Sequence, residues 1–187
     1  MERSTNGHDE TRFNMMHIIF TGVECTFKSS LAQAVGSALA RKVCPEFARE
    51  YLDHFYPTPS MDKFPREQFD AIAKGQIRAQ KTYGYYNDGQ CIFDTDGLTL
   101  EIWGADKFGA RDIQWLTPGA PSFYLLCAPT NSYTSDEYRI DGHRREELHL
   151  KFVELLDALG RPYVILHEPI FENRLFEALR IIKELGI

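Results

Sequence analysis

Short apolar runs alternate with longer amphipathic segments along most of this chain. The apolar runs predict strands at residues 17–20, 42–47, 91–93, 122–127 and 162–166. Elsewhere apolar residues recur at helical spacing, as Leu31, Val35 and Leu39 do. Such spacing predicts helices at residues 28–41, at about 65–87, through Leu98 and Ile102, at 146–159, and through Leu175 and Ile182. Gly160 stands where the glycine that ends a helix belongs.

The predicted strands are short and almost wholly apolar, which indicates a sheet that is covered on both faces. Because helices separate the strands, we predict a three-layer α/β/α fold with a mainly parallel, five-stranded sheet. Ligands of such sheets bind beyond the carboxyl ends of the strands. The residues that directly follow each strand are therefore the candidates for chemistry.

The 187 residues suffice for one domain, which we expect at 15–187 after a polar, disordered tail at 1–14. The hydrophobic share of 43% and the charged share of 26% exclude disorder throughout. A net charge of −6 argues against a nucleic-acid partner. No apolar run reaches the roughly 18 residues of a membrane helix, and the N-terminus lacks the apolar core of a signal peptide. Four cysteines without Cys-x-x-Cys spacing fit a cytoplasmic protein with no zinc site.

The loop between the first strand and its helix resembles a phosphate-binding motif. Against G-x-x-x-x-G-K-[ST], the sequence matches at Gly22, Lys28 and Ser29, and Phe27 replaces the second glycine. In this motif backbone amides face the phosphates of ATP, the lysine reaches the β- and γ-phosphates, and the hydroxyl binds Mg²⁺. The predicted nucleotide-binding residues are Gly22, Glu24, Cys25, Thr26, Phe27, Lys28, Ser29 and Ser30. We therefore expect an architecture like that of P-loop NTPases and nucleotide kinases.

Phe27 leaves a second interpretation of this loop open. Glycine at that position lets the backbone approach a ligand closely and adopt unusual dihedrals. A phenylalanine has to point away from the phosphates and accept the local backbone geometry. We expect it either to weaken nucleotide binding or, if its φ stays negative, to be harmless. The alternative is an ordinary strand-turn-helix in which a serine caps the helix.

Two carboxylates, Asp94 and Asp96, follow the third strand. If that strand lies beside the first, Asp94 is close to Ser29, and the two residues are candidates to hold Mg²⁺. One carboxylate would hold the metal through water, and the other would accept a proton from the hydroxyl of a substrate. Asp94 is therefore predicted to be catalytic and substrate-binding. Asp96 is a substrate-binding candidate, with capping of the next helix as the alternative.

A long polar segment follows the fourth strand, and it predicts a lid at about 128–145. Arg139 and Arg145 lie in it and are predicted to neutralise charge that develops on a transferred phosphoryl group. The alternative is a solvated face in which these arginines pair with acidic neighbours.

Charged and aromatic residues follow the second strand, where the second substrate of a P-loop kinase docks. Glu46 and Arg49 are candidates to hold a sugar hydroxyl, and Trp103 is a candidate to stack on a flat base. The alternative for Glu46 and Arg49 is the start of an amphipathic helix.

Taken together, these motifs resemble the bacterial ribosylnicotinamide kinase family over about residues 18–185. The resemblance rests on residues 22–29, 45–52, 93–96 with Ile102, Trp103 and Gly109, Asp136 with Arg139, and residues 145–149. It implies ATP- and Mg²⁺-dependent phosphorylation of the 5′-hydroxyl of nicotinamide riboside. It also implies that Lys28 and Ser29 bind phosphate and metal, that Asp94 and Asp96 serve ribose and Mg²⁺, and that Arg139 and Arg145 belong to the lid. Phe27 departs from the pattern, and we expect no adenylyltransferase or DNA-binding domain in a chain of this length.

Two other functions remain open at this point. One is a P-loop ATPase or a kinase of another small metabolite, because the same fold serves many acceptors. The other is a non-catalytic nucleotide-binding module in which Phe27 closes the phosphate site. The sequence leaves the acceptor and the oligomeric state undetermined.

Overall fold

The computed structural model describes residues 16–55, 64–86, 90–109, 121–134 and 141–187. The predicted tail at 1–14 lies outside these ranges, and so does Arg139 in the predicted lid. None of the helices in the described part of the chain is both long and apolar enough to span a membrane.

Five parallel strands form one sheet in the order β2-β3-β1-β4-β5. The strands are β1 (His17–Thr21), β2 (Val43–Cys44), β3 (Ile92–Asp94), β4 (Ser122–Cys127) and β5 (Tyr163–Leu166). Their parallel pairing and the helices on both faces confirm the predicted three-layer fold. Because β3 and β4 flank β1, the segments that follow these three strands meet at one edge of the sheet.

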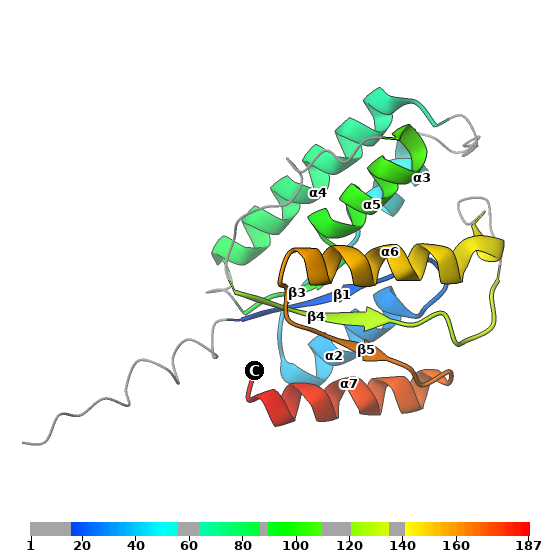
Figure 1. Ribbon diagram of the computed structural model, residues 1–187. Helices are drawn as coiled ribbons and strands as arrows, with labels where there is room; N and C mark the ends of the chain where they lie inside the picture. Colours follow the sequence, from blue (N-terminus) through cyan, green and yellow to red (C-terminus); the bar gives the residue numbers. More distant parts are fainter. Residues whose placement is uncertain (1–15, 56–63, 87–89, 110–120, 135–140) are drawn as a thin grey trace, which may run out of the picture.

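The described helices lie in two layers, with α2 and α7 on one face of the sheet and α4, α5 and α6 on the other (Figure 1). They are α2 (Lys28–Leu39), α3 (Phe47–Phe55), α4 (Arg66–Tyr86), α5 (Gly97–Phe108), α6 (Arg145–Ala158) and α7 (Phe171–Leu185), with a 3-10 turn, η3 (Gly142–Arg144), before α6. Gly160 follows α6 with a φ of 58°, and its amide donates to Asp157 O, as expected of a residue that ends a helix.

Successive residues of β1 point to opposite sides of the sheet, and each side has its own core. Ile18 and Phe20 pack with α2 and α7, whereas Ile19 packs with α5 and α6. Burial on both faces explains why the strand is apolar at every position. A third, smaller cluster lies among α3, α4 and α5, and includes Leu52 and Phe69.

The segment after β2 differs from the expectation. We predicted a strand over 42–47, but only Val43 and Cys44 are paired, and α3 begins at Phe47. The amide of Phe47 donates to Gln76 Oε1 on α4 at 2.6 Å, and its ring lies where a Cβ on Gly75 would be. Gly75 therefore permits close packing of α3 on α4, a tertiary contact that local apolar spacing does not reveal.

An ion-pair cluster ties the start of α6 to α5. Asp106 on α5 accepts hydrogen bonds from Arg144 at 2.6 and 3.1 Å and from Lys151 at 2.9 Å. Arg144 also lies 3.0 Å from Glu147, so this arginine pairs with acidic neighbours. The two cations, Arg144 foremost, lower the pKa of Asp106 to about 2.

Asp106→Asn is expected to lower the free energy of unfolding at pH 7 by about 1 kcal/mol, since solvent screens this half-exposed cluster. The pKa of Asp106 is lower in the folded protein than in the unfolded chain. Its contribution to the free energy of unfolding is therefore complete above the unfolded pKa and is lost as the pH falls toward 2. Urea titrations of both proteins between pH 7 and pH 3 should show the deficit of the variant shrinking on acidification. A deficit that stays constant over this range contradicts the assignment.

Candidate active site

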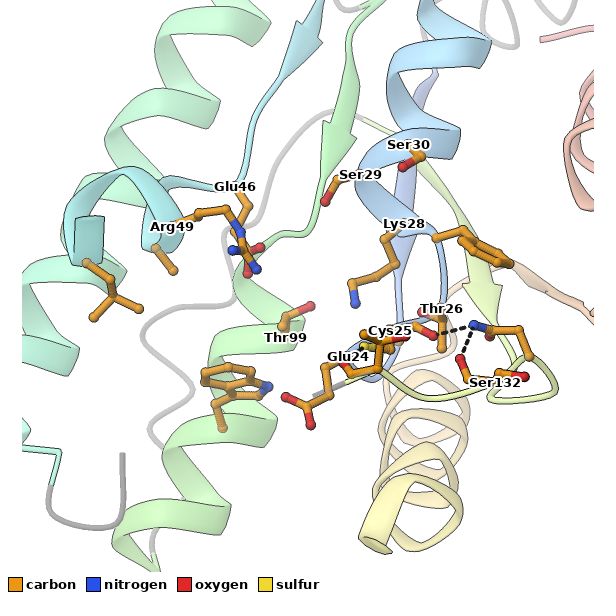
Figure 2. Close-up of a pocket in the computed structure, with 17 residues that line it drawn as sticks. Glu24, Cys25, Thr26, Lys28, Ser29, Ser30, Glu46, Arg49, Thr99 and Ser132 are labelled. Carbon is orange, nitrogen blue, oxygen red and sulfur yellow. Dashed lines mark hydrogen bonds between the residues drawn. The ribbon is translucent and has the colours of Figure 1, made fainter. Parts of the chain in front are cut away.

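A cavity of about 310 Å³ opens at the carboxyl edge of the sheet (Figure 2). Its lining comes from the loop after β1, the start of α3, one face of α5 and the segment after β4. The lining residues are Gly22, Glu24, Cys25, Thr26, Phe27, Lys28, Ser29, Ser30, Glu46, Ala48, Arg49, Leu52, Thr99, Trp103, Asn131, Ser132 and Thr134. The cavity thus brings together all eight predicted loop residues with Glu46, Arg49 and Trp103.

The loop after β1 has an unusual backbone. Gly22 has a φ of 125°, and a Cβ there would lie 2.8 Å from the carbonyl oxygen of Cys127 on β4. Cys25 and Phe27 have φ values of 53° and 66°. Residues other than glycine rarely adopt this left-handed region. The condition under which Phe27 was expected to be harmless, a negative φ, is therefore not met.

The Phe27 ring packs against α7. It lies edge-on to Phe171 with ring centroids 5.7 Å apart, and the guanidinium of Arg174 lies 5.8 Å from its centroid. These contacts anchor the side chain on α7, and Phe27 also belongs to the cavity lining. The positive φ that the motif obtains from glycine is here adopted by a residue whose partly buried ring packs against the core.

The loop exposes a row of unused backbone donors. Among the described residues, no acceptor takes a hydrogen bond from the amides of residues 24–30. The first amide of α2 that is bonded belongs to Leu31, and it donates to Phe27 O at 2.8 Å. Consecutive free amides at a helix N-terminus form an electropositive, anion-binding concavity.

Lys28 and Ser29 face the cavity at the first turn of α2. The ammonium of Lys28 donates to Val23 O at 2.6 Å, within the loop itself. In Figure 2, Glu46 and Arg49 lie across the cavity from these two residues. A phosphate group bound by the loop would therefore lie beside the ammonium of Lys28.

Asp94 ends β3 next to β1, where it pairs in register with Phe20, and it is 4% exposed. Burial raises its pKa, against a hydrogen bond from the Ser29 hydroxyl and the charge of Lys28. Its Oδ1 is buried and has no hydrogen-bond partner in the structure. An unpartnered carboxylate oxygen beside a serine hydroxyl offers the hard oxygen donors that Mg²⁺ prefers, so these residues fit that ion.

Asp96 does not line the cavity. It is the N-cap of α5, and its Oδ1 accepts from the amide of Leu98 at 3.0 Å. Its Oδ2 accepts from the hydroxyl of Tyr124 at 2.6 Å, and the residue is 7% exposed. The structure thus shows the helix-capping alternative that the sequence left open, and the substrate-binding role of Asp96 stays a prediction.

Asp96→Ala is expected to lower the free energy of unfolding by about 2 kcal/mol, because it removes the cap and leaves a buried hydroxyl without its partner. Asp96→Asn should cost much less, since an asparagine oxygen also caps a helix. Urea denaturation measures both variants. A folded Asp96→Ala protein that loses affinity for the phosphate acceptor would support the substrate-binding role.

Arg145 also lies away from the cavity lining. It is 7% exposed, and it donates to Asn131 O at 3.0 Å and to Cys25 O at 2.9 Å. Glu24 links the same regions, because its Oε1 accepts from the Tyr133 hydroxyl at 3.0 Å and the Asp141 amide at 2.9 Å. Arg145 therefore holds the loop to the segment after β4 instead of projecting into the cavity.

Sequence reasoning missed several residues of this region. Asn131 and Thr99 line the cavity, and the Asn131 side chain donates to Cys25 O at 2.7 Å. Asn131 follows a strand end, so the rule applied to the other strands would have selected it. Nothing in the local sequence singles out Arg174, which contacts the back of the loop from α7.

A smaller apolar pocket of about 30 Å³ adjoins the cavity. The two share Glu46, Ala48, Leu52, Thr99 and Trp103. The lining that only the smaller pocket has is Phe64, Phe69, Ile72, Gln76, Thr95, Leu100 and Lys107. The site therefore joins a larger cavity of mixed polar and apolar lining to a small apolar pocket with aromatic walls.

Comparisons with known proteins agree with this geometry. A family model described as an AAA domain matches residues 17–174, and no curated protein matches the sequence. A crystal structure of NadR protein in complex with NR has a TM-score of 0.75 at 18% identity, covering 94% of this chain and 52% of that one. Deoxyadenosine kinase from M. mycoides has a TM-score of 0.67 at 14% identity, covering 90% and 100%. Thymidylate kinase from Candida albicans has a TM-score of 0.65 at 12% identity, covering 92% and 93%.

The chain spans about half the length of the NadR structures. At these identities the likeness concerns the fold, which is that of P-loop NTPases and nucleotide kinases.

Proposed function

The chain belongs to the family described as an AAA domain, and we propose that it is an ATP-dependent phosphotransferase. The proposed acceptor is the 5′-hydroxyl of a nucleoside, with nicotinamide riboside as the first candidate. One observation carries the proposal: the unbonded amides of residues 24–30 lie beside Lys28 and the Ser29–Asp94 pair. The family resemblance of the motifs and the fold likeness to a NadR protein bound to NR support the choice of acceptor.

The donor half of the site would hold the triphosphate. The loop amides donate to its oxygens, and the ammonium of Lys28 leaves Val23 O for the β- and γ-phosphates. The Ser29 hydroxyl and Asp94 would hold Mg²⁺, which supplies charge neutralisation at the phosphate oxygens. The residues at 128–145 are proposed to act as a lid, with Arg139 as its phosphate-contacting arginine and Arg145 as its anchor on the loop.

The acceptor half would hold the nucleoside. Both oxygens of Asp96 are engaged in capping and with Tyr124, so another group has to take the proton of the acceptor hydroxyl. Glu46 lines both pockets and lies across the cavity from Lys28, which suits a proton acceptor (Figure 2). Arg49 beside it is proposed to hold a sugar hydroxyl. Trp103 offers its ring to a flat base, and a positively charged pyridinium is especially favoured there.

Trp103→Ala is expected to raise the KM for the nucleoside about three- to tenfold, the loss of one stacking contact of about 0.5–1.5 kcal/mol. The KM for ATP should change less, because Trp103 lines both pockets from α5 and does not belong to the phosphate loop. Steady-state kinetics with each substrate varied in turn measure both values. Phe176→Ala, at a side chain that is 72% exposed on α7, is the matched control. Equal changes in the two KM values contradict the assignment.

The function itself is tested by ADP release with a panel of acceptors. Nicotinamide riboside, deoxyadenosine and thymidine monophosphate are compared with a reaction that has no acceptor, and products are identified by mass spectrometry. We expect ADP release that depends on the nucleoside and yields its 5′-monophosphate. ADP release that is independent of any acceptor supports an ATPase, and failure to bind ATP supports a non-catalytic module.

A further inference from the structure

Among the described residues, Arg174 is the largest side chain that is completely buried, and it joins three segments behind the phosphate loop. From α7, its Nη1 donates to Thr26 O at 3.0 Å. Its Nε donates to Glu168 O at 2.5 Å, in the segment between β5 and α7. Its Nη2 donates to the hydroxyl of Thr130 at 2.5 Å, and that hydroxyl donates to His167 O.

This placement is costly for a charged side chain. Arg174 is 0% exposed, and none of the ion pairs formed between described residues involves it. Its guanidinium is satisfied by neutral oxygens and by the face of the Phe27 ring. A buried cation without a carboxylate partner stabilises a fold poorly compared with an apolar side chain. A role in the adjacent site accounts for the arginine better than stability does.

The bond to Thr26 fixes the orientation of one peptide group. A trans peptide is planar, so its C=O and its N–H point in opposite directions. Arg174 holds the Thr26 carbonyl on the α7 side of the loop, and the amide of Phe27 therefore points away from α7, toward the cavity that Phe27 lines. The same peptide leads into the positive φ of Phe27, which is unfavourable for a residue with a side chain.

Two neighbouring carbonyls of the loop are held in the same way. Val23 O accepts from the Thr26 hydroxyl at 2.8 Å as well as from Lys28, and Cys25 O accepts from Asn131 and Arg145. Of these partners, Thr26, Lys28 and Asn131 line the cavity themselves. Arg174, like Arg145, does not line the cavity, and it reaches the loop from α7, on the opposite side of the Thr26–Phe27 peptide from Phe27 N–H.

We propose that Arg174 is a positioning residue for nucleotide binding, which holds the Thr26–Phe27 peptide so that the Phe27 amide faces the phosphates. Together with the packed ring of Phe27, it replaces the conformational freedom that the second glycine of the motif provides. The inference rests on the proposed function, because it assumes that the loop binds a nucleotide triphosphate.

The test uses binding of Mg²⁺ and AMP-PNP, measured by calorimetry, together with steady-state kinetics. Arg174→Lys keeps the charge but loses the planar fork, and it is expected to weaken AMP-PNP binding about tenfold while the KM for the nucleoside stays the same. Thr130→Val removes one partner of Arg174 at an exposed position, with little risk to folding, and should weaken binding about two- to threefold. Arg180→Lys, on the exposed side of α7, is the matched control and should bind normally.

A double-mutant cycle separates positioning from general destabilisation. In a Phe27→Gly background the loop adopts its conformation without strain, so adding Arg174→Lys or Thr130→Val should change AMP-PNP affinity less than twofold. The proposal is overturned if folded Arg174→Lys and Thr130→Val proteins bind AMP-PNP like the wild type, or if their losses persist in the glycine background. If the wild type itself binds no AMP-PNP, the proposed function fails and the inference fails with it.

Discussion

Lys28→Ala is expected to lower the rate of phosphoryl transfer by about 10²–10³-fold, the effect of removing one aligned charge donor from a developing anion. Lys28 belongs to the loop and lines the cavity together with it, so loss of the ammonium leaves the transferred phosphoryl group without that neutralisation. The fold should tolerate the change, because Lys28 makes a single hydrogen bond to Val23 O, worth about 1 kcal/mol. The measurement is single-turnover phosphoryl transfer with saturating ATP and acceptor.

Lys42→Ala is the matched control for this experiment, since Lys42 is an exposed lysine just after α2. Its rate should equal that of the wild type. Unchanged turnover in Lys28→Ala, with the protein folded, would mean that the loop does not carry the chemistry.

Gly22→Ala is expected to lower the free energy of unfolding by about 3 kcal/mol and to abolish nucleotide binding. The added Cβ would lie 2.8 Å from the carbonyl oxygen of Cys127 and 3.3 Å from its nitrogen, both on the backbone of a central strand that cannot move aside. The φ of 125° adds strain, because residues with a side chain rarely adopt it. Urea denaturation and calorimetry with AMP-PNP measure the two effects.

Gly109→Ala separates the two causes. Gly109 has a φ of 74°, but a Cβ there would meet no atom within 4 Å, so only backbone strain of about 1 kcal/mol is expected. Equal destabilisation by Gly22→Ala and Gly109→Ala would show that the contact with β4 is unimportant.

The layered fold could be predicted because its signal is local. Strands that are buried on both faces are apolar at every position, and the helices between them repeat their apolar residues at helical spacing. The sequence predicted all five strands in this way, and rules for strand ends led to ten of the cavity residues and to Asp94. These inferences need only the periodicity of apolar residues along the sequence and the rule that ligands bind at the carboxyl ends of parallel strands.

What escaped prediction depends on contacts between segments that are distant along the chain. Helix α3 begins early because Phe47 packs on Gly75 of α4. Asp96 turns away from the cavity because Tyr124, on another strand, takes its second oxygen. The positive φ of Phe27 is stabilised from α7, about 145 residues further along, through Phe171 and Arg174. No pattern within one segment contains this information.

A crystal structure with Mg²⁺, AMP-PNP and nicotinamide riboside would test directly whether the loop after β1 binds the phosphates of the nucleotide. We expect the β- and γ-phosphate oxygens within hydrogen-bonding distance of the amides of residues 24–30, and the ammonium of Lys28 on the phosphates instead of on Val23 O. The nucleoside should lie against Trp103 with its 5′-hydroxyl toward Glu46. A nucleotide bound elsewhere on the protein, with Lys28 still on Val23 O and the loop amides facing solvent, would contradict the assignment of this loop.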